Sequence, residues 1–345
     1  MNKNKLKIIY IMIGMILLVS EIFGGGGRRN GTGGAQELLI PVSARGLALS
    51  GAYTSGITGI DAIFYNPAGL GVSKNSAEAM FSYMNYIADI NFSFAAVAVH
   101  FDDFGSLGFN VRTLDFGDIP VTTIENPEGT GAVFSPTFVV LGVTYSNALT
   151  DRIRVGFTAN LISEEIQRTS ASGVSFDAGV QYNGIGGVEG LKLGVALLNL
   201  GPAMSYDGAD LDARVNQVDG KRTAQFYRLN TAQFELPSIL ELGLAYERSF
   251  SDEISALVST SFQNNNFSND EYRFAAEFNY NDLLFLRGGY SYIQEAADDT
   301  EEGIFGPTFG VGLNFNQGMD IRVDYAFRTV EYFDANHMFT VQLGF

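Results

Sequence analysis

The sequence predicts an all-β fold: a transmembrane antiparallel β-barrel of about 14 strands with an N-terminal hatch segment in the lumen. Three observations lead to this prediction. Apolar and polar residues alternate with period two in one segment after another from about residue 77 onward. Most of these segments have the length of about 9 to 11 residues that a tilted strand needs to cross a membrane. The long connections between them fall on one side only.

The first 35 residues have the pattern of an export signal that is cleaved. A basic N-terminal region precedes an apolar run of 12 residues. This run is too short to cross a bilayer as a helix, which needs about 20 residues. The basic residues of this region are Lys3, Lys5 and Lys7. The best cleavage site follows Ala35. We therefore expect a signal peptide at residues 1–35, the hatch segment at residues 36–76 and the barrel at residues 77–345.

The composition excludes several classes of function. The 345 residues include 40 Gly, 28 Phe and 16 Tyr but no Cys, which suits one large all-β unit and removes disulfides and thiolate metal ligands. Residues 1–35 hold five basic residues and one acidic residue, so the rest of the chain keeps 16 basic and 37 acidic side chains, a formal charge of −21. Nucleic-acid phosphates require a basic footprint. We therefore expect no nucleic-acid partner, and we expect no metal site and no cofactor.

The stretch at residues 46–71 differs from everything that follows it. Small residues and hydroxyl side chains crowd its first half, and an apolar run then meets Asn66, Pro67, Ala68 and Gly69. Pro67 restricts the residue before it to extended conformations, and Gly69 permits a positive φ, so the tetrapeptide should form a tight turn. Small residues allow such a segment to fold compactly in a confined space. We expect it to occupy the periplasmic half of the barrel lumen.

Residues 41–71, with AIFYNPAGL as their most specific part, resemble the amino-terminal hatch of FadL-like outer-membrane barrels. They resemble the PorV/PorQ group within that superfamily more closely. The match covers about a tenth of the chain. Thr58 and Gly59 stand where relatives often carry an acidic pair, so no role that rests on those carboxylates is carried over. The side chains expected to pack the hatch are those of Asp61, Phe64 and Tyr65.

Fourteen segments show the alternating pattern of barrel strands. A soluble sandwich also alternates, but it buries the apolar face that a membrane barrel turns toward lipid. The last segment alternates up to Phe345, an ending familiar from bacterial outer-membrane barrels and read by their assembly machinery. The predicted strands are residues 77–86, 91–101, 106–115, 135–147, 152–164, 173–183, 190–200, 237–249, 253–263, 271–280, 283–294, 307–315, 320–333 and 337–345.

The connections between the predicted strands alternate in length. Those after the second, fourth, sixth, eighth, tenth and twelfth strands are short, whereas three of the others are long: 116–134, 201–236 and 295–306. Outer-membrane barrels have short periplasmic turns and long extracellular loops. We therefore expect the three long loops to lie together outside the cell, opposite both termini of the mature chain.

Charged side chains occupy the alternate strand positions that would face the lumen. On the lipid face each would cost about 2 to 4 kcal/mol at the midplane, so their regular placement supports the barrel. We favour the interpretation that they join the wall and the hatch by ion pairs over the alternative that they recognise a substrate. The predicted lumen charges are Arg112, Arg154, Asp177, Lys192, Glu241, Glu247, Arg273, Glu277, Arg287, Arg322, Asp324 and Arg328.

An enzyme is not expected, and no catalytic residue is assigned. A hydrolase needs a base close to a nucleophile, but neither His100 nor His337 stands in a catalytic motif. His100 lies at the end of a predicted strand, and His337 begins the last one. Polar roles at the two membrane interfaces explain both residues better.

Two functions from different classes remain. The closer resemblance implies an interaction component of a type IX-like protein secretion system, with exported proteins or other secretion components as partners. The broader resemblance implies the alternative, a passive channel for hydrophobic or amphipathic small molecules. In both cases the chain would be exported by its signal peptide and folded into the bacterial outer membrane, with the lipid and the barrel assembly machinery as partners. A channel should have an apolar pocket between hatch and wall, whereas a secretion component should expose a protein-binding surface among its loops.

Overall fold

The computed structural model describes residues 32–101, 104–215, 225–293, 303–316 and 318–345. The predicted export signal, apart from its last four residues, lies outside the described residues, as do parts of two predicted long loops.

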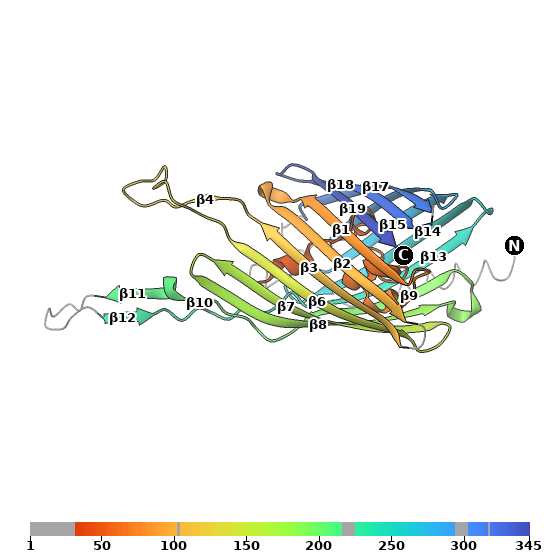
Figure 1. The fold of residues 1–345 in the computed structure, drawn as a ribbon, viewed down its shortest axis with the longest axis horizontal. Helices are drawn as coiled ribbons and strands as arrows, with labels where there is room; N and C mark the ends of the chain where they lie inside the picture. The colour runs from red at the N-terminus through yellow and green to blue at the C-terminus, as the bar shows by residue number, and fades with distance from the viewer. Residues whose placement is uncertain (1–31, 102–103, 216–224, 294–302, 317) are drawn as a thin grey trace.

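Fourteen antiparallel strands form one closed barrel, which confirms the predicted fold class (Figure 1). Each strand pairs with its neighbour in the chain, and β1 pairs with β19 to close the ring. The first seven barrel strands are β1 (Ala77–Asn85), β2 (Asn91–Phe101), β3 (Gly105–Asp115), β6 (Thr137–Ala148), β7 (Ile153–Ile166), β8 (Thr169–Asn183) and β9 (Leu191–Leu200). The other seven are β13 (Ile239–Ser249), β14 (Ile254–Asn265), β15 (Glu271–Tyr280), β16 (Leu284–Ile293), β17 (Phe305–Asn316), β18 (Asp320–Val330) and β19 (Asn336–Gly344).

The wall of the barrel is apolar outside and polar inside. Phe81, Leu161 and Phe309 expose more than half of their side-chain surface on the outward face, whereas the inward-facing Asp324 is fully buried. Soluble proteins rarely expose a continuous ring of large apolar side chains to water. This distribution is the one that a lipid-facing barrel requires.

The two ends of the barrel differ as the connection lengths predict. The loop after β3 carries a small ladder of β4 (Ile119–Pro120) and β5 (Val133–Phe134), and the loop after β9 carries another of β11 (Asp212–Val215) and β12 (Gln225–Arg228). Both project from the same end of the barrel, which we call the long-loop end (Figure 1). The short turns form the opposite, short-turn end. The pattern of the sequence did not predict these ladders.

Smaller elements complete these connections. The loop after β9 also holds β10 (Asp207–Gly208), which pairs with β8, and the helix η7 (Ala209–Leu211). The helix η5 (Ile87–Asp89) joins β1 to β2, and η6 (Ile185–Gly187) joins β8 to β9.

The N-terminal segment, residues 32–76, crosses the inside of the barrel. Its helices are η2 (Gln36–Leu39), α2 (Ala44–Ala48), η3 (Gly59–Asp61), α3 (Ala62–Tyr65) and η4 (Pro67–Gly71). The helix α2 packs against β16, β17, β18 and β19, whereas η4 packs against β3, β6, β7 and β8 on the other side of the ring. No helix among the described residues is long and apolar enough to cross a membrane.

The N-terminal segment runs along the barrel from one end to the other. Gly33 forms a β-bridge with Glu235 in the long loop after β9, and Leu38 packs in the same apolar cluster as Leu236. At the other end of the segment, the Ser76 backbone N–H donates to the carbonyl of Phe345. The prediction that both mature termini lie opposite the long loops is therefore wrong for the amino-terminal side.

Candidate functional site

The predicted turn at residues 66–69 lies where the N-terminal segment meets the wall. The Asn66 side chain accepts a hydrogen bond from the backbone N–H of Ala68 at 3.1 Å, so it caps η4 as a turn-forming Asn can. Its amide donates to the carbonyls of Thr54 at 3.0 Å and Val180 at 3.2 Å. Asn66 thus joins the turn, the rest of the segment and the wall.

Close approach, rather than a positive φ, explains the glycine of this turn. Gly69 lies within η4 and is not among the residues with positive φ, which differs from the prediction. A Cβ at Gly69 would stand 2.3 Å from the carbonyl oxygen of Ile57. A Cβ at Gly156 of β7 would stand 2.2 Å from the carbonyl carbon of Pro67. The absence of a side chain at Gly69 therefore lets the segment pack closely on itself, and its absence at Gly156 lets the backbone of Pro67 touch the wall.

The three residues predicted to pack the segment occupy different environments. Asp61 is buried and accepts a hydrogen bond from the Gln342 amide of β19 at 2.8 Å. Phe64 and Tyr65 pack edge to face with ring centroids 4.8 Å apart. The Arg112 guanidinium of β3 lies 5.3 Å from the Phe64 ring centroid.

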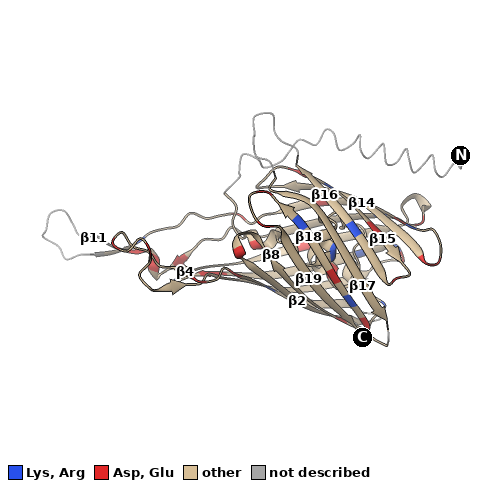
Figure 2. Ribbon diagram, turned by 90° about the horizontal axis from the view of Figure 1, so that it is seen from above, with Lys and Arg blue, Asp and Glu red and all other residues tan. Residues whose placement is uncertain are grey.

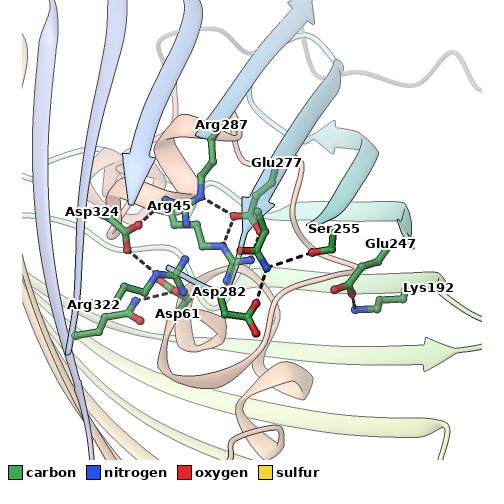
Figure 3. Close-up of polar contacts among 12 residues, drawn as sticks. Arg45, Asp61, Lys192, Glu247, Ser255, Glu277, Asp282, Arg287, Arg322 and Asp324 are labelled. Carbon is green, nitrogen blue, oxygen red and sulfur yellow. Dashed lines mark hydrogen bonds and ion pairs between the residues drawn. The ribbon is translucent and has the colours of Figure 1, made fainter. Parts of the chain in front are cut away.

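Arginines and carboxylates alternate in a cluster between α2 and the wall (Figure 3). Arg45 of α2 donates twice to the Glu277 carboxylate, at 2.7 and 2.9 Å. Arg287 donates to the same carboxylate at 2.5 Å and to Asp324, which also lies 3.0 Å from Arg322. Burial opposes the charge of Arg45, but the Glu277 carboxylate outweighs it and raises the pKa of Arg45. The cluster ties the segment to β15, β16 and β18.

The other predicted lumen charges divide into local groups on the inward face of their strands. Arg273 pairs with Glu271 at 2.8 Å, and Arg328 donates to the Asn336 side chain at 2.7 and 3.0 Å. Glu241 is buried on β13. These residues stand nearer the long-loop end than the cluster of Arg45 does.

A further group lies on the other side of the ring. Asn160 accepts from Arg112 at 3.4 Å and donates to Asp177 at 2.9 Å, so a neutral amide stands between the two charges. Lys192 pairs with Glu247 at 2.6 Å close to the short-turn end. Arg154, on the inward face of β7, is neither fully buried nor fully exposed. The predicted charges therefore do not converge on one centre.

Several neutral side chains of the wall hold the segment, and they were not singled out in the sequence. The Gln181 amide donates to the carbonyls of Thr54 at 3.1 Å and Ile57 at 2.9 Å. Thr340 accepts from the backbone N–H of Ala44 at 2.8 Å. Gln181 and Thr340 both occupy inward-facing positions of their strands, where any hydrophilic residue fits the alternating pattern. Alternation alone therefore could not distinguish them.

The two histidines lie at opposite ends of the barrel. His100 contacts Ser106 through Nδ1 at 2.7 Å and Glu78 through Nε2 at 3.1 Å, an order that resembles a hydrolase triad. Ser106 is buried, however, and lines neither of the cavities described below. The three residues join β1, β2 and β3. His337 lies on the outside, 2.8 Å from the Tyr325 hydroxyl.

Two cavities lie between the N-terminal segment and the wall toward the long-loop end. The larger, which we call the aromatic cavity, has a volume of about 450 Å³. Its aromatic lining consists of Tyr86, Phe116, Phe138, Tyr206 and Phe234. The smaller, the polar cavity, has a volume of about 200 Å³, and its lining includes Arg112, Asp177, Glu241, Arg273 and Arg328.

The short helix η2 separates these cavities. Glu37 and Ile40 line the aromatic cavity, whereas Leu38 and Leu39 line the polar one. Beyond the polar cavity, α2, α3 and η4 fill the lumen with buried apolar side chains. The segment therefore leaves space at the long-loop end and closes the barrel toward the short-turn end.

Comparison with solved structures finds similar barrels that are remote in sequence. The toluene transporter TbuX of Ralstonia pickettii aligns with a TM-score of 0.54 at 14% identity, over 88% of this chain and 98% of that one. The toluene transporter TodX of Pseudomonas putida aligns with a TM-score of 0.53 at 14% identity, over 87% and 96%. A FadL homologue of Pseudomonas aeruginosa aligns with a TM-score of 0.52 at 13% identity, over 88% and 98%.

The chain has the fold of these channels. No protein-family model matches it, and neither does any curated protein. The structural likeness agrees with the broader resemblance to FadL-like barrels. The narrower resemblance to the PorV/PorQ group stays a prediction.

Proposed function

We propose that the protein is a passive channel of the outer membrane for hydrophobic or amphipathic small molecules. The observation that carries this proposal is the aromatic cavity between the N-terminal segment and the wall. Its volume of about 450 Å³ lies in the range of small-molecule sites, and five aromatic side chains line it. The related folds include two toluene transporters, so monoaromatic hydrocarbons are suitable first ligands to test.

The arrangement of the lumen suggests the route. A ligand would enter from the long loops into the aromatic cavity and pass η2 into the polar cavity. From there α2 to η4 block further movement, so release toward the short-turn end requires this part of the segment to shift. The hatch role predicted for residues 36–76, with its turn at residues 66–69, is thus part of the proposal.

The proposed location follows from the same features. The apolar outer face suits the lipid of a bacterial outer membrane, and the pattern at residues 1–35 suits export, with folding by the barrel assembly machinery. The long loops would then face outward. The type IX secretion interpretation stays a prediction.

Uptake of a labelled monoaromatic hydrocarbon by cells that lack their own hydrocarbon channels tests the proposal. Expression of the protein should raise the initial rate, and a Leu114→Trp variant should reduce that rate several-fold because its side chain fills the aromatic cavity. Phe109→Trp is the matched control, since Phe109 lies on the lipid face of the same strand and is 53% exposed. Heat-modifiable gel mobility would verify that both variants form barrels. An uptake rate that expression does not change would refute the channel.

A further inference from the structure

The aromatic cavity contains a buried carboxyl group that forms no ion pair among the described residues. Glu37 of η2 lines the cavity, and only 3% of its surface is exposed. Its polar neighbour is the carboxyl group of Glu164, and no basic side chain among the described residues donates a hydrogen bond to either of its oxygens. A buried charge or acceptor left in this state is destabilising, which makes it a feature that requires explanation.

A second carboxylate lines the same cavity. Glu164 of β7 is also 97% buried, and its Oε2 accepts a hydrogen bond from the Tyr206 hydroxyl, while its Oε1 has no described partner. Burial and the charge of Glu164 raise the pKa of Glu37 to about 8. At neutral pH Glu37 is therefore mostly protonated.

The charged groups around Glu37 come from three elements. Glu164 faces it from β7, and Tyr206 lies beside both carboxylates in the loop after β9. Arg112 of β3 also favours the charged form of Glu37, but its guanidinium donates a hydrogen bond to Asn160 and lines the polar cavity. The aromatic cavity itself thus presents acceptors and ring faces and no cationic side chain among its described lining residues.

We propose that the aromatic cavity selects hydrophobic molecules that carry an ammonium group, which Glu37 and Glu164 bind. This inference rests on the proposed channel function and adds its ligand class. An ammonium head would donate charge-assisted hydrogen bonds to Glu37 and to the unsatisfied Oε1 of Glu164, and the ring faces would stabilise the cation further. The apolar part of the ligand would fill the remainder of the cavity. A carboxylate head would meet two acids in a buried site and be repelled.

Proton competition adds a second signature. An ammonium ligand binds best when Glu37 is ionised, and the raised pKa of Glu37 places this ionisation near pH 8. Affinity for the ammonium ligand should therefore rise between pH 6.5 and pH 8.5, the direction in which Glu37 loses its proton. Affinity for a neutral ligand of the same shape should stay constant.

Three ligands of matched shape test the inference on the full chain in lipid nanodiscs: 2-phenylethylammonium, 3-phenylpropanoate and propylbenzene. Binding is followed by saturation-transfer NMR, and only the signal that Leu114→Trp abolishes is counted as cavity binding. At pH 8.5 we expect the ammonium ligand to bind at least about tenfold more tightly than the carboxylate, the scale of one charged hydrogen bond. Glu37→Gln and Glu164→Gln should each remove most of this preference and leave propylbenzene within about twofold.

Glu165→Gln is the matched control, because Glu165 neighbours Glu164 but points out of the lumen. It should leave the preference unchanged. If propylbenzene binds but the preference is absent, reversed or insensitive to both Gln variants, the inference is overturned while the channel stands. If none of the three ligands binds in the cavity, the channel proposal fails together with it.

Discussion

A disulfide between the N-terminal segment and the wall should hold the proposed channel closed. A Cβ at Gly56 would lie 3.7 Å from the Cβ of Ala245 on β13, close to the mean separation of about 3.8 Å in disulfides. The chain contains no Cys, so Gly56→Cys with Ala245→Cys would introduce the only thiols. The closest neighbour of the new side chain is the terminal methyl Cδ1 of Leu257, at 3.3 Å, which can shift by a few tenths of an ångström.

The magnitude of the effect follows from this geometry. Disulfides hold their Cβ atoms within about 4.5 Å of each other, so the segment could move from the wall by less than about 1 Å at this point. An aromatic ring needs contact distances of about 3.5 to 4 Å from the atoms on either side. Oxidation should therefore reduce hydrocarbon uptake by at least about tenfold if the segment must move there, and a reductant should restore it.

The assay compares oxidised and reduced protein in the same vesicles. Ala245→Cys with Ser259→Cys is the control, since Ser259 pairs with Ala245 in the neighbouring strand and a bridge there leaves the segment free. Each single Cys variant controls for the substitutions themselves. Full uptake through a quantitatively oxidised Gly56–Ala245 bridge would refute the idea that this part of the segment moves during passage.

Three further predictions concern the segment and the loops. Gly156→Val should dislodge the segment, because its Cβ would overlap the backbone of Pro67, and planar-bilayer recordings should show a raised leak through an assembled barrel. Arg45→Met should lower the free energy of unfolding by about 2 kcal/mol in a urea titration, because two charged hydrogen bonds to the buried Glu277 are lost. The same substitution should cost less in a Glu277→Gln background, where the partner charge is already absent. Protease added to intact cells should cut within residues 201–236, and cleavage confined to the short turns would mean that the orientation is reversed.

Much of the fold could be predicted from the sequence because one face of every strand meets lipid. The alternation of Val323, Asp324 and Tyr325 specifies which side chain points inward, and a slip by one residue would turn the charge toward lipid. Connection lengths then predicted the two ends of the barrel. The link between Asn66 and its own turn was also predictable, since an Asn before Pro forms such local hydrogen bonds readily.

The path of the N-terminal segment and the cavities could not be predicted in the same way. The bridge between Gly33 and Glu235 joins residues about 200 positions apart, and no local pattern marks either of them. The aromatic cavity is lined by η2, by the ends of three strands and by two long loops, so its lining forms only when the ring closes. Glu37 and Glu164 look like ordinary polar residues in sequence, and only their shared burial distinguishes them.

Deletion of residues 42–70 tests the central claim most directly. This change removes α2 to η4 and keeps the barrel strands and the amino-terminal residues before them. In planar bilayers the deleted protein should form stable pores with a conductance far above that of the intact protein, and cells that carry it should admit a bulky antibiotic. A deletion in the loop at 201–236 controls for the loss of residues outside the barrel. An assembled barrel that conducts no more than the intact one would contradict the account, because the segment would then not be what closes the lumen.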